Sequence, residues 1–119
     1  MTPGRANPIV HLELHTRDLL GARVLYERLL EWRSERIECG RGSYTALELG
    51  GAFGGGIVEC ETRHPIWLPY VQVSDARAAT EHARALGAAV LLEPREGAAG
   101  WRSVVSAQAG AQIAFWEPK

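Results

Sequence analysis

Three side chains that can carry protons or bind metal ions stand on alternate residues near the start of the chain, in the stretch PIVHLELHTRD. They are His11, Glu13 and His15, and they are separated by Leu12 and Leu14. This alternation is typical of a half-buried strand with one polar and one apolar face. Imidazole and carboxylate groups on one face favour a metal centre, an acid–base site or the polar wall of a binding groove.

The elements around this stretch form a recognisable order. The alternation predicts a strand over residues 9–16, Asp18 is a predicted N-cap, and LLGARVLYERLLEW predicts an amphipathic helix over residues 19–32. The helix is expected to pack through its apolar residues, which are Leu19, Leu20, Val24, Leu25, Leu29 and Trp32, and to expose Arg23, Glu27 and Arg28. Three further strands are predicted over residues 32–39, 43–49 and 55–61, separated by GRG and by the loop GGAFGGG.

The second half of the chain repeats this order. WLPYVQVS predicts a strand, Asp75 an N-cap, and ARAATEHARALG a helix that ends at Gly87. Strands are predicted over residues 89–94, 101–108 and 111–118. Asp18 and Asp75 are 57 residues apart (75 − 18), so the sequence predicts one α+β domain, 1–119, of two tandem βαβββ modules, at about 8–62 and 66–117.

Composition restricts the class of function. The 119 residues carry a net charge of −1 and no long run of one sign, which disfavours nucleic acid as a partner. No apolar run approaches the roughly 18 residues of a membrane span, so a soluble, cytoplasmic protein is expected. Cys39 and Cys60 have neither CxxC nor zinc-finger spacing, and they are expected to be reduced thiols.

The chain resembles the glyoxalase, bleomycin-resistance and dioxygenase superfamily, whose fold is called the vicinal oxygen chelate fold. The resemblance covers residues 9–116 and rests on the order and duplication of the motifs HLELHTRD, LYERLLEW, GGAFGGG, WLPYVQVSD and GAQIAFWEP. It implies that each module is a curved mixed sheet with a helix on its outer face. The inner faces of the two sheets are then expected to form a concave ligand-binding surface.

The resemblance also implies where a metal would bind. In families of this fold a divalent metal is held from the first and last strands of the modules. The matching positions here are His11 and Glu59 in the first module, and Leu68 and Ala114 in the second. Leucine and alanine cannot bind a metal, and a catalytic site ordinarily needs three protein ligands. We therefore expect no cofactor, and the alternative is one divalent metal at His11 and Glu59 with lyase, isomerase or dioxygenase activity.

Strand alternation predicts which side chains line the concave surface. Rings and hydrogen-bonding groups are mixed there, as is typical of small-molecule sites. The expected ligand-binding residues are His11, Glu13, His15, Tyr44, Glu48, Glu59, Leu68, Tyr70, Trp101, Gln112 and Trp116, with Ile57, Glu61, Gln72 and Ala114 on the same faces. Trp32 is expected in the core, and the pattern leaves the facing of Trp67 and Trp101 open.

Metal-free members of the superfamily include drug-binding resistance proteins. The resemblance therefore implies a non-catalytic protein that sequesters a small molecule, as in antibiotic self-resistance, and works as a homodimer. A nearly neutral chain favours a planar aromatic natural product over a strongly cationic drug. The other alternative is a metal-free enzyme of a biosynthetic pathway, with Glu13, His15 or Glu59 as general base.

Overall fold

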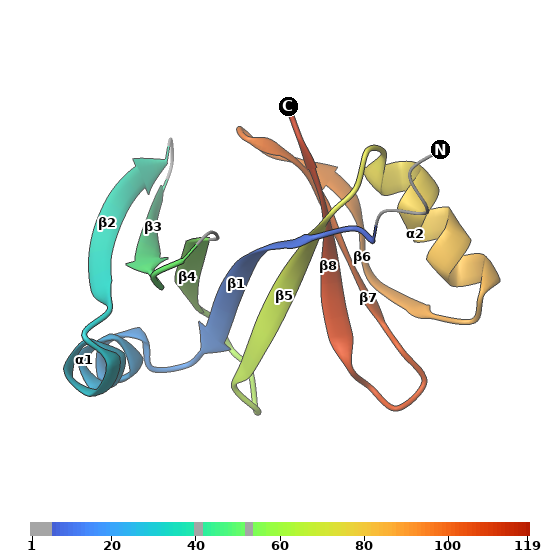
Figure 1. Cartoon of the computed structure of the whole chain (residues 1–119). Helices are drawn as coiled ribbons and strands as arrows, with labels where there is room; N and C mark the ends of the chain where they lie inside the picture. The colour runs from blue at the N-terminus through green and yellow to red at the C-terminus, as the bar shows by residue number, and fades with distance from the viewer. Residues whose placement is uncertain (1–5, 40–41, 52–53) are drawn as a thin grey trace. The chain divides into compact units, whose positions relative to one another are not determined.

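The computed structural model describes residues 6–39, 42–51 and 54–119, and it contains two successive βαβββ modules (Figure 1). The predicted α+β class and its duplicated order are confirmed. The first module consists of β1 (Ile9–Thr16), α1 (Leu19–Leu30), β2 (Arg33–Cys39), β3 (Gly42–Glu48) and β4 (Gly54–Glu59). The second consists of β5 (Ile66–Gln72), α2 (Ala76–Ala85), β6 (Ala89–Glu96), β7 (Gly100–Ser106) and β8 (Gln112–Pro118).

The chain divides into two compact units. The N-terminal unit is residues 10–68, and the C-terminal unit is residues 69–119 together with the segment that ends at Ile9. The N-terminal strands follow the order β2-β3-β4-β1, and the C-terminal strands follow the order β5-β8-β7-β6. In each unit the first and fourth strands of the module are parallel neighbours, and the other pairs are antiparallel. The third strand is thus separated from the first by the fourth alone.

Both predicted N-caps are confirmed. The Asp18 carboxylate accepts a hydrogen bond from the Gly21 amide at 2.9 Å, and that of Asp75 accepts one from the Ala78 amide at 3.0 Å. Each carboxylate satisfies an amide that has no partner inside the helix. The predicted helix-ending glycine, Gly87, follows α2 with φ +101°, a conformation that glycine adopts without steric cost.

The core of the N-terminal unit lies between α1 and the sheet. Leu14, Leu47 and Ile57 are its buried centre, at 5%, 3% and 1% exposed. Aromatic rings extend this core: the Tyr26 ring lies 5.6 Å from those of both Trp32 and Trp67. The prediction that Trp32 belongs to the core is confirmed, and Trp67, whose facing the pattern left open, packs there too.

The face that α1 turns to the sheet differs from the predicted one. Leu19, Ala22 and Tyr26 pack against the core, whereas four residues predicted to pack are exposed: Leu20 (60%), Val24 (39%), Leu25 (55%) and Leu29 (64%). Their prediction as a packed face was wrong. Apolar residues occur around most of this helix, so periodicity alone does not define its inner face. In the observed orientation of α1, Tyr26 faces the sheet and contacts Trp32 and Trp67.

In the C-terminal unit, α2 packs against β6, β7 and β8 (Figure 1). Thr80 on α2 and Ser103 on β7 are fully buried, and their hydroxyl oxygens lie 2.7 Å apart in a hydrogen bond. Trp101 lies under the Arg77 guanidinium of α2, 5.4 Å from the ring centroid. No helix in the described part of the chain is long and apolar enough to cross a membrane. Cys60 is a free thiol, and the side chain of Cys39 lies outside the described residues.

Candidate functional site

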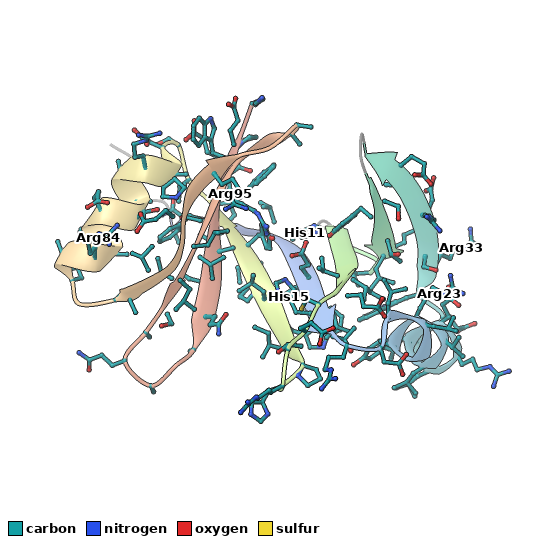
Figure 2. All side chains as sticks on the ribbon, turned by 180° about the vertical axis from the view of Figure 1, so that it is seen from behind. His11, His15, Arg23, Arg33, Arg84 and Arg95 are labelled. Atoms are coloured by element: carbon teal, nitrogen blue, oxygen red, sulfur yellow. The ribbon has the colours of Figure 1, made fainter. Side chains whose placement is uncertain are left out.

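A hydrogen-bonded network connects β1 to β3 in the N-terminal unit. The Glu13 carboxylate is 5% exposed. Its Oε1 lies 2.8 Å from His15 Nε2, and its Oε2 accepts a hydrogen bond of 2.9 Å from the Tyr44 hydroxyl. The Tyr44 oxygen lies 2.8 Å from His11 Nε2. The His-Glu-His row is therefore joined into one network with Tyr44, which we call the Glu13 network; Figure 2 labels its two histidines.

A glycine of β4, Gly56, leaves the room that this network occupies. Tyr44 is on β3, and β4 lies between β3 and β1. Gly56 is the register partner of Glu13, and a Cβ at Gly56 would lie 2.7 Å from Cε2 of the Tyr44 ring and closer still to its hydroxyl. The phenol thus reaches Glu13 across the bare backbone of Gly56. Neither Gly54 nor Gly56 has a positive φ, so space rather than backbone conformation requires glycine at position 56.

The directions of these hydrogen bonds follow from the charge of the carboxylate. An ionised Glu13 can only accept, so Tyr44 O–H and His15 Nε2–H both donate to it. Because the Tyr44 hydroxyl donates its proton to Glu13, its oxygen can only accept from His11, and His11 Nε2–H is the donor. His15 hydrogen-bonds through Nε2, and its Nδ1 makes no hydrogen bond in the described part of the chain. An imidazole held through one nitrogen by a carboxylate presents the other as a proton acceptor.

The C-terminal unit has rings and arginines at the corresponding positions. Tyr70 is 6% exposed, and its hydroxyl accepts a hydrogen bond of 3.0 Å from Arg102 Nη1. The Tyr70 and Trp116 rings lie 6.5 Å apart, inclined at 59°. Trp116 and Arg102 are register partners on β8 and β7, and so they share one face of the sheet with Tyr70. This places Tyr70 and Trp116 on one face, as expected from the sequence.

Several other expected site residues lie elsewhere. Leu14 and Ile57 are register partners in the core under α1, so the expectation that Ile57 shares a face with His11 was wrong. Glu59, two residues further along β4, also lies on the α1 side, where its carboxylate accepts a hydrogen bond of 3.2 Å from the Leu19 amide. Glu61 follows the end of β4.

The remaining expected residues are not part of the Glu13 network. Trp101 lies against α2, on the face opposite to Arg102. Glu48 is exposed, Gln112 is half-buried, and Leu68 is 1% exposed. Whether these residues contact a ligand stays a prediction.

The donor set for a divalent metal is not assembled here. His11 and Glu59 face opposite sides of the sheet, and each already has a hydrogen-bond partner. Among the residues that the structure describes, no group of three or more His, Cys, Asp and Glu side chains is arranged to hold a metal ion. Metal sites ordinarily bring three or four such donors to one point. These residues therefore do not fit the divalent-metal alternative.

No family model and no curated protein matches the sequence, but the structure has many similar solved structures. A hypothetical protein from Bacillus halodurans aligns with 97% of this chain and 96% of its own, at a TM-score of 0.74 and 14% identity. The methylmalonyl-CoA epimerase of Mycobacterium tuberculosis aligns with 100% of this chain and 93% of its own, at a TM-score of 0.69 and 19% identity. The chain has the vicinal oxygen chelate fold.

A variant of 4-hydroxymandelate synthase from Streptomyces coelicolor aligns with 97% of this chain but 39% of its own, at a TM-score of 0.70 and 18% identity. At such identities the comparison establishes the fold and not the activity. The similar structures whose names state an activity are mostly those of enzymes.

Two kinds of residue were missed from the sequence. Gly56 was predicted to lie in the strand over residues 55–61, and it lies in β4 (Gly54–Glu59), but it was not expected in the site because a residue without a side chain gives no signal of what packs against it. Arg102 was missed because Trp101 beside it was the more conspicuous ring, and a one-residue change of phase exchanges the two faces of a strand. The usable signal was the two-residue period of the strand, which places Arg102 on the same face as Val104 and on the opposite face to Trp101.

Proposed function

We propose that this protein is a metal-independent enzyme that transfers a proton to and from a small carbon acid, with His15 as the general base. The observation that carries the proposal is the buried Glu13 carboxylate held between His15 Nε2 and the Tyr44 hydroxyl. A base that is oriented by a carboxylate, which is itself fixed by a third group, is the arrangement of many proton-transfer sites. Of the alternatives raised by the sequence, this is the metal-free enzyme.

Each residue of the network has a distinct proposed role. His15 Nδ1 accepts the proton from a carbon beside a carbonyl group, and the imidazolium that forms keeps its Nε2–H on Glu13. The negative carboxylate stabilises this positive charge. Tyr44 and His11 position Glu13 and do not touch the substrate. The proton then returns from Nδ1 to the substrate, so the reaction is an isomerisation and needs no other reactant.

The names of the structural neighbours are compatible with this class of reaction. Several are methylmalonyl-CoA epimerases, and inversion of a carbon centre beside a carbonyl proceeds through removal and return of a proton. The likeness in fold does not carry the substrate over. We therefore propose the reaction class, and the small-molecule partner and the predicted homodimer stay predictions.

The test follows exchange of carbon-bound hydrogen for deuterium. The protein is incubated in D2O with methylmalonyl-CoA and, separately, with a panel of 1,3-dicarbonyl and 2-hydroxyketone compounds, and loss of the acidic C–H signal is followed by proton NMR. We expect exchange above the buffer rate for at least one compound. Substitution His15→Asn should reduce that rate by about 100-fold or more, and His82→Asn, at an exposed position on α2, should leave it unchanged.

Exchange no faster than in buffer for every compound, or exchange that survives His15→Asn, would remove the enzyme assignment. The second candidate is the non-catalytic sequestering protein predicted from the sequence, and it is favoured by the Tyr70–Trp116 ring pair. It predicts that an aromatic compound binds and perturbs these rings without any exchange or chemical change.

A further inference from the structure

The hairpin of β6 and β7 places two arginines directly opposite each other. Arg95 and Arg102 are register partners, and side chains at such positions have Cβ atoms roughly 4.5–5.5 Å apart on the same face. Like charges at this spacing destabilise a hairpin. In the part of the chain that the structure describes, neither guanidinium forms an ion pair.

The surrounding charges do not offset this pair. Glu96 also lines the pocket, and its carboxylate lies 3.0 Å from Lys119 Nζ in an ion pair. Arg102 donates one N–H to the hydroxyl of Tyr70, which carries no charge. By contrast, the exposed Arg84 on α2 lies 3.1 Å from Glu81 and 2.9 Å from Glu93, and these hydrogen bonds raise the pKa of its guanidinium. Arg95 and Arg102 are therefore an uncompensated positive pair.

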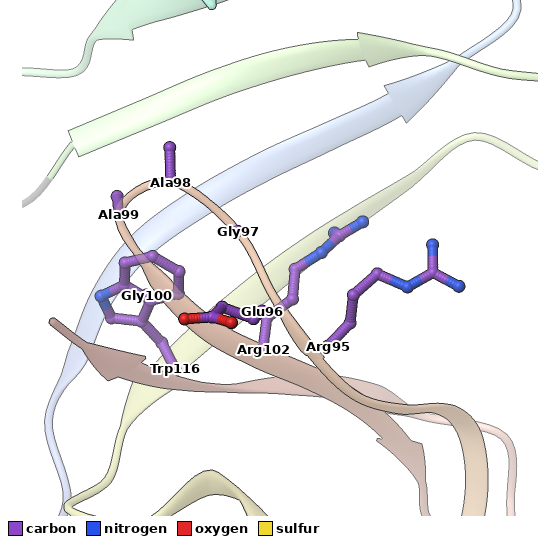
Figure 3. Close-up of a pocket in the computed structure, with 8 residues that line it drawn as sticks. All are labelled: Arg95, Glu96, Gly97, Ala98, Ala99, Gly100, Arg102 and Trp116. Carbon is purple, nitrogen blue, oxygen red and sulfur yellow. The ribbon is translucent and has the colours of Figure 1, made fainter. Parts of the chain in front are cut away.

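A pocket of about 350 Å³ joins this pair to a flat ring. It is lined by the two arginines, the turn from Glu96 to Gly100, and Trp116 (Figure 3). A Cβ at Gly100 would clash with the backbone carbonyl oxygen of Glu117 and would lie 3.0 Å from Cη2 of the Trp116 indole, so glycine lets the turn pack closely against β8 and that ring. Figure 3 shows both guanidinium groups extending in the same direction beside the turn. The volume falls within the range of small-molecule sites, about 300–1,000 Å³.

We propose that this pocket is a binding site for an organic anion with a flat ring. Its carboxylate or phosphate group lies between the Arg95 and Arg102 guanidiniums, which present planar forks of donors to such oxygens. Its ring lies on the Trp116 indole, which stacks on aromatic faces. The site uses the C-terminal unit alone, and it goes beyond the proton-transfer function proposed for the Glu13 network.

The test titrates the full chain with four probes at low ionic strength, where exposed charges are least screened. The probes are 2-naphthoate, 2-naphthyl phosphate, the neutral ester methyl 2-naphthoate and inorganic phosphate. Binding is followed through the indole N–H signal of Trp116 in nitrogen–proton NMR spectra, assigned as the signal lost in Trp116→Phe. We expect at least one naphthyl anion to shift this signal and to bind at least 10-fold more tightly than both the ester and inorganic phosphate.

The variants separate the arginines from the general charge of the protein. Arg95→Gln and Arg102→Gln should each weaken the naphthyl anion about 10- to 100-fold, because each removes a charge-assisted hydrogen bond. Arg84→Gln removes the same charge on α2 and should change affinity less than twofold. Arg95 is exposed, so its variant is expected to keep the wild-type urea midpoint even if Arg102→Gln does not. Equal binding of ester and anions, or unchanged affinity in Arg95→Gln, would overturn the proposal.

Discussion

In the N-terminal unit the Tyr44 phenol of β3 crosses β4 and donates to Glu13 on β1. In the C-terminal unit the Arg102 guanidinium of β7 crosses β8 and donates to Tyr70 on β5. Glu13 and Tyr70 are 57 positions apart (70 − 13), and they are 5% and 6% exposed. The two modules thus repeat one arrangement, in which a side chain of the third strand satisfies a buried polar group of the first.

The fourth-strand residues that these two side chains pass over differ by one methyl group. Gly56 is the register partner of Glu13, and Ala114 is the register partner of Tyr70. Ala114 is 0% exposed, and its Cβ does not prevent Arg102 from reaching Tyr70. A guanidinium on a linear chain can pass beside a methyl group, whereas the rigid ring of Tyr44 occupies the space that the methyl group would need. The shape of the donor therefore determines which small residue the fourth strand can carry.

The largest loss of stability is expected for Gly56→Ala, which removes the space through which Tyr44 reaches Glu13. The added Cβ would force the Tyr44 ring away from Glu13, so the variant adds overpacking to the loss of a hydrogen bond on a buried carboxylate. We expect the free energy of unfolding to fall by about 3 kcal/mol. Urea denaturation measures this loss, and displacement of the Tyr44 ring signals in NMR spectra identifies its cause.

Two controls isolate the role of the Tyr44 ring. Gly54→Ala adds the same atom on the same face of β4, but its Cβ would lie 3.6 Å from His11 Nδ1, an ordinary contact distance. This variant should change stability by less than about 0.5 kcal/mol. In a Tyr44→Ala background, Gly56→Ala should lower the free energy of unfolding equally little, because the ring that clashes with the added Cβ is absent. Additive effects of Tyr44→Ala and Gly56→Ala would contradict the steric explanation.

The fold was largely predictable from the sequence because the spacing of apolar residues and the positions of the capping residues indicate the same helices and strands. The alternation of residues 9–16, the capping residues Asp18 and Asp75, and the glycine after α2 all mark boundaries that the structure confirms. Their repetition at a spacing of 57 residues indicated the duplicated modules. The inward face of α1 was not predictable in this way, because leucines occur on several of its faces and the observed face includes Tyr26, which contacts Trp32 and Trp67.

The candidate site was predictable from the sequence on β1 and, for Tyr44, on β3, but not on β4. His11, Glu13 and His15 alternate with leucines, so their common face follows from the sequence. On β4 the run Gly54, Gly55 and Gly56 carries no side chains that could define the faces, and the neighbouring Ile57 and Val58 are both apolar. The faces of that strand were therefore assigned one residue out of phase, which moved Glu59 to the wrong side. Crossing of β4 by Tyr44 depends on strand order, which the sequence does not state.

A smaller effect is expected from the reverse change in the second module, Ala114→Gly. Arg102 does not need the extra space, so its hydrogen bond to Tyr70 should persist. The loss then comes from the backbone freedom of glycine in a strand, and we expect about 1 kcal/mol from urea denaturation. Unchanged NMR signals of the Tyr70 ring would accompany it. If Ala114→Gly instead cost as much as Gly56→Ala, the two crossings would not differ in the way that donor shape predicts.

The smallest net effect is expected for Arg102→Leu, because it removes two opposing contributions. Loss of the hydrogen bond to Tyr70 destabilises the protein by about 1 kcal/mol, while loss of the repulsion between Arg95 and Arg102 stabilises it by roughly 0.5 kcal/mol. We expect a net loss of about 0.5 kcal/mol at low salt.

Salt separates these two contributions, because salt screens the repulsion in the wild type but does little to the half-buried hydrogen bond. The difference in stability between wild type and Arg102→Leu should therefore grow toward about 1 kcal/mol at 0.5 M NaCl. Urea denaturation of both proteins at 20 mM and 0.5 M NaCl, roughly Debye lengths of 20 Å and 4 Å, measures this growth. A difference that shrinks with salt would mean that Arg102 is held by an attractive charge, and the uncompensated arginine pair would then not exist in solution.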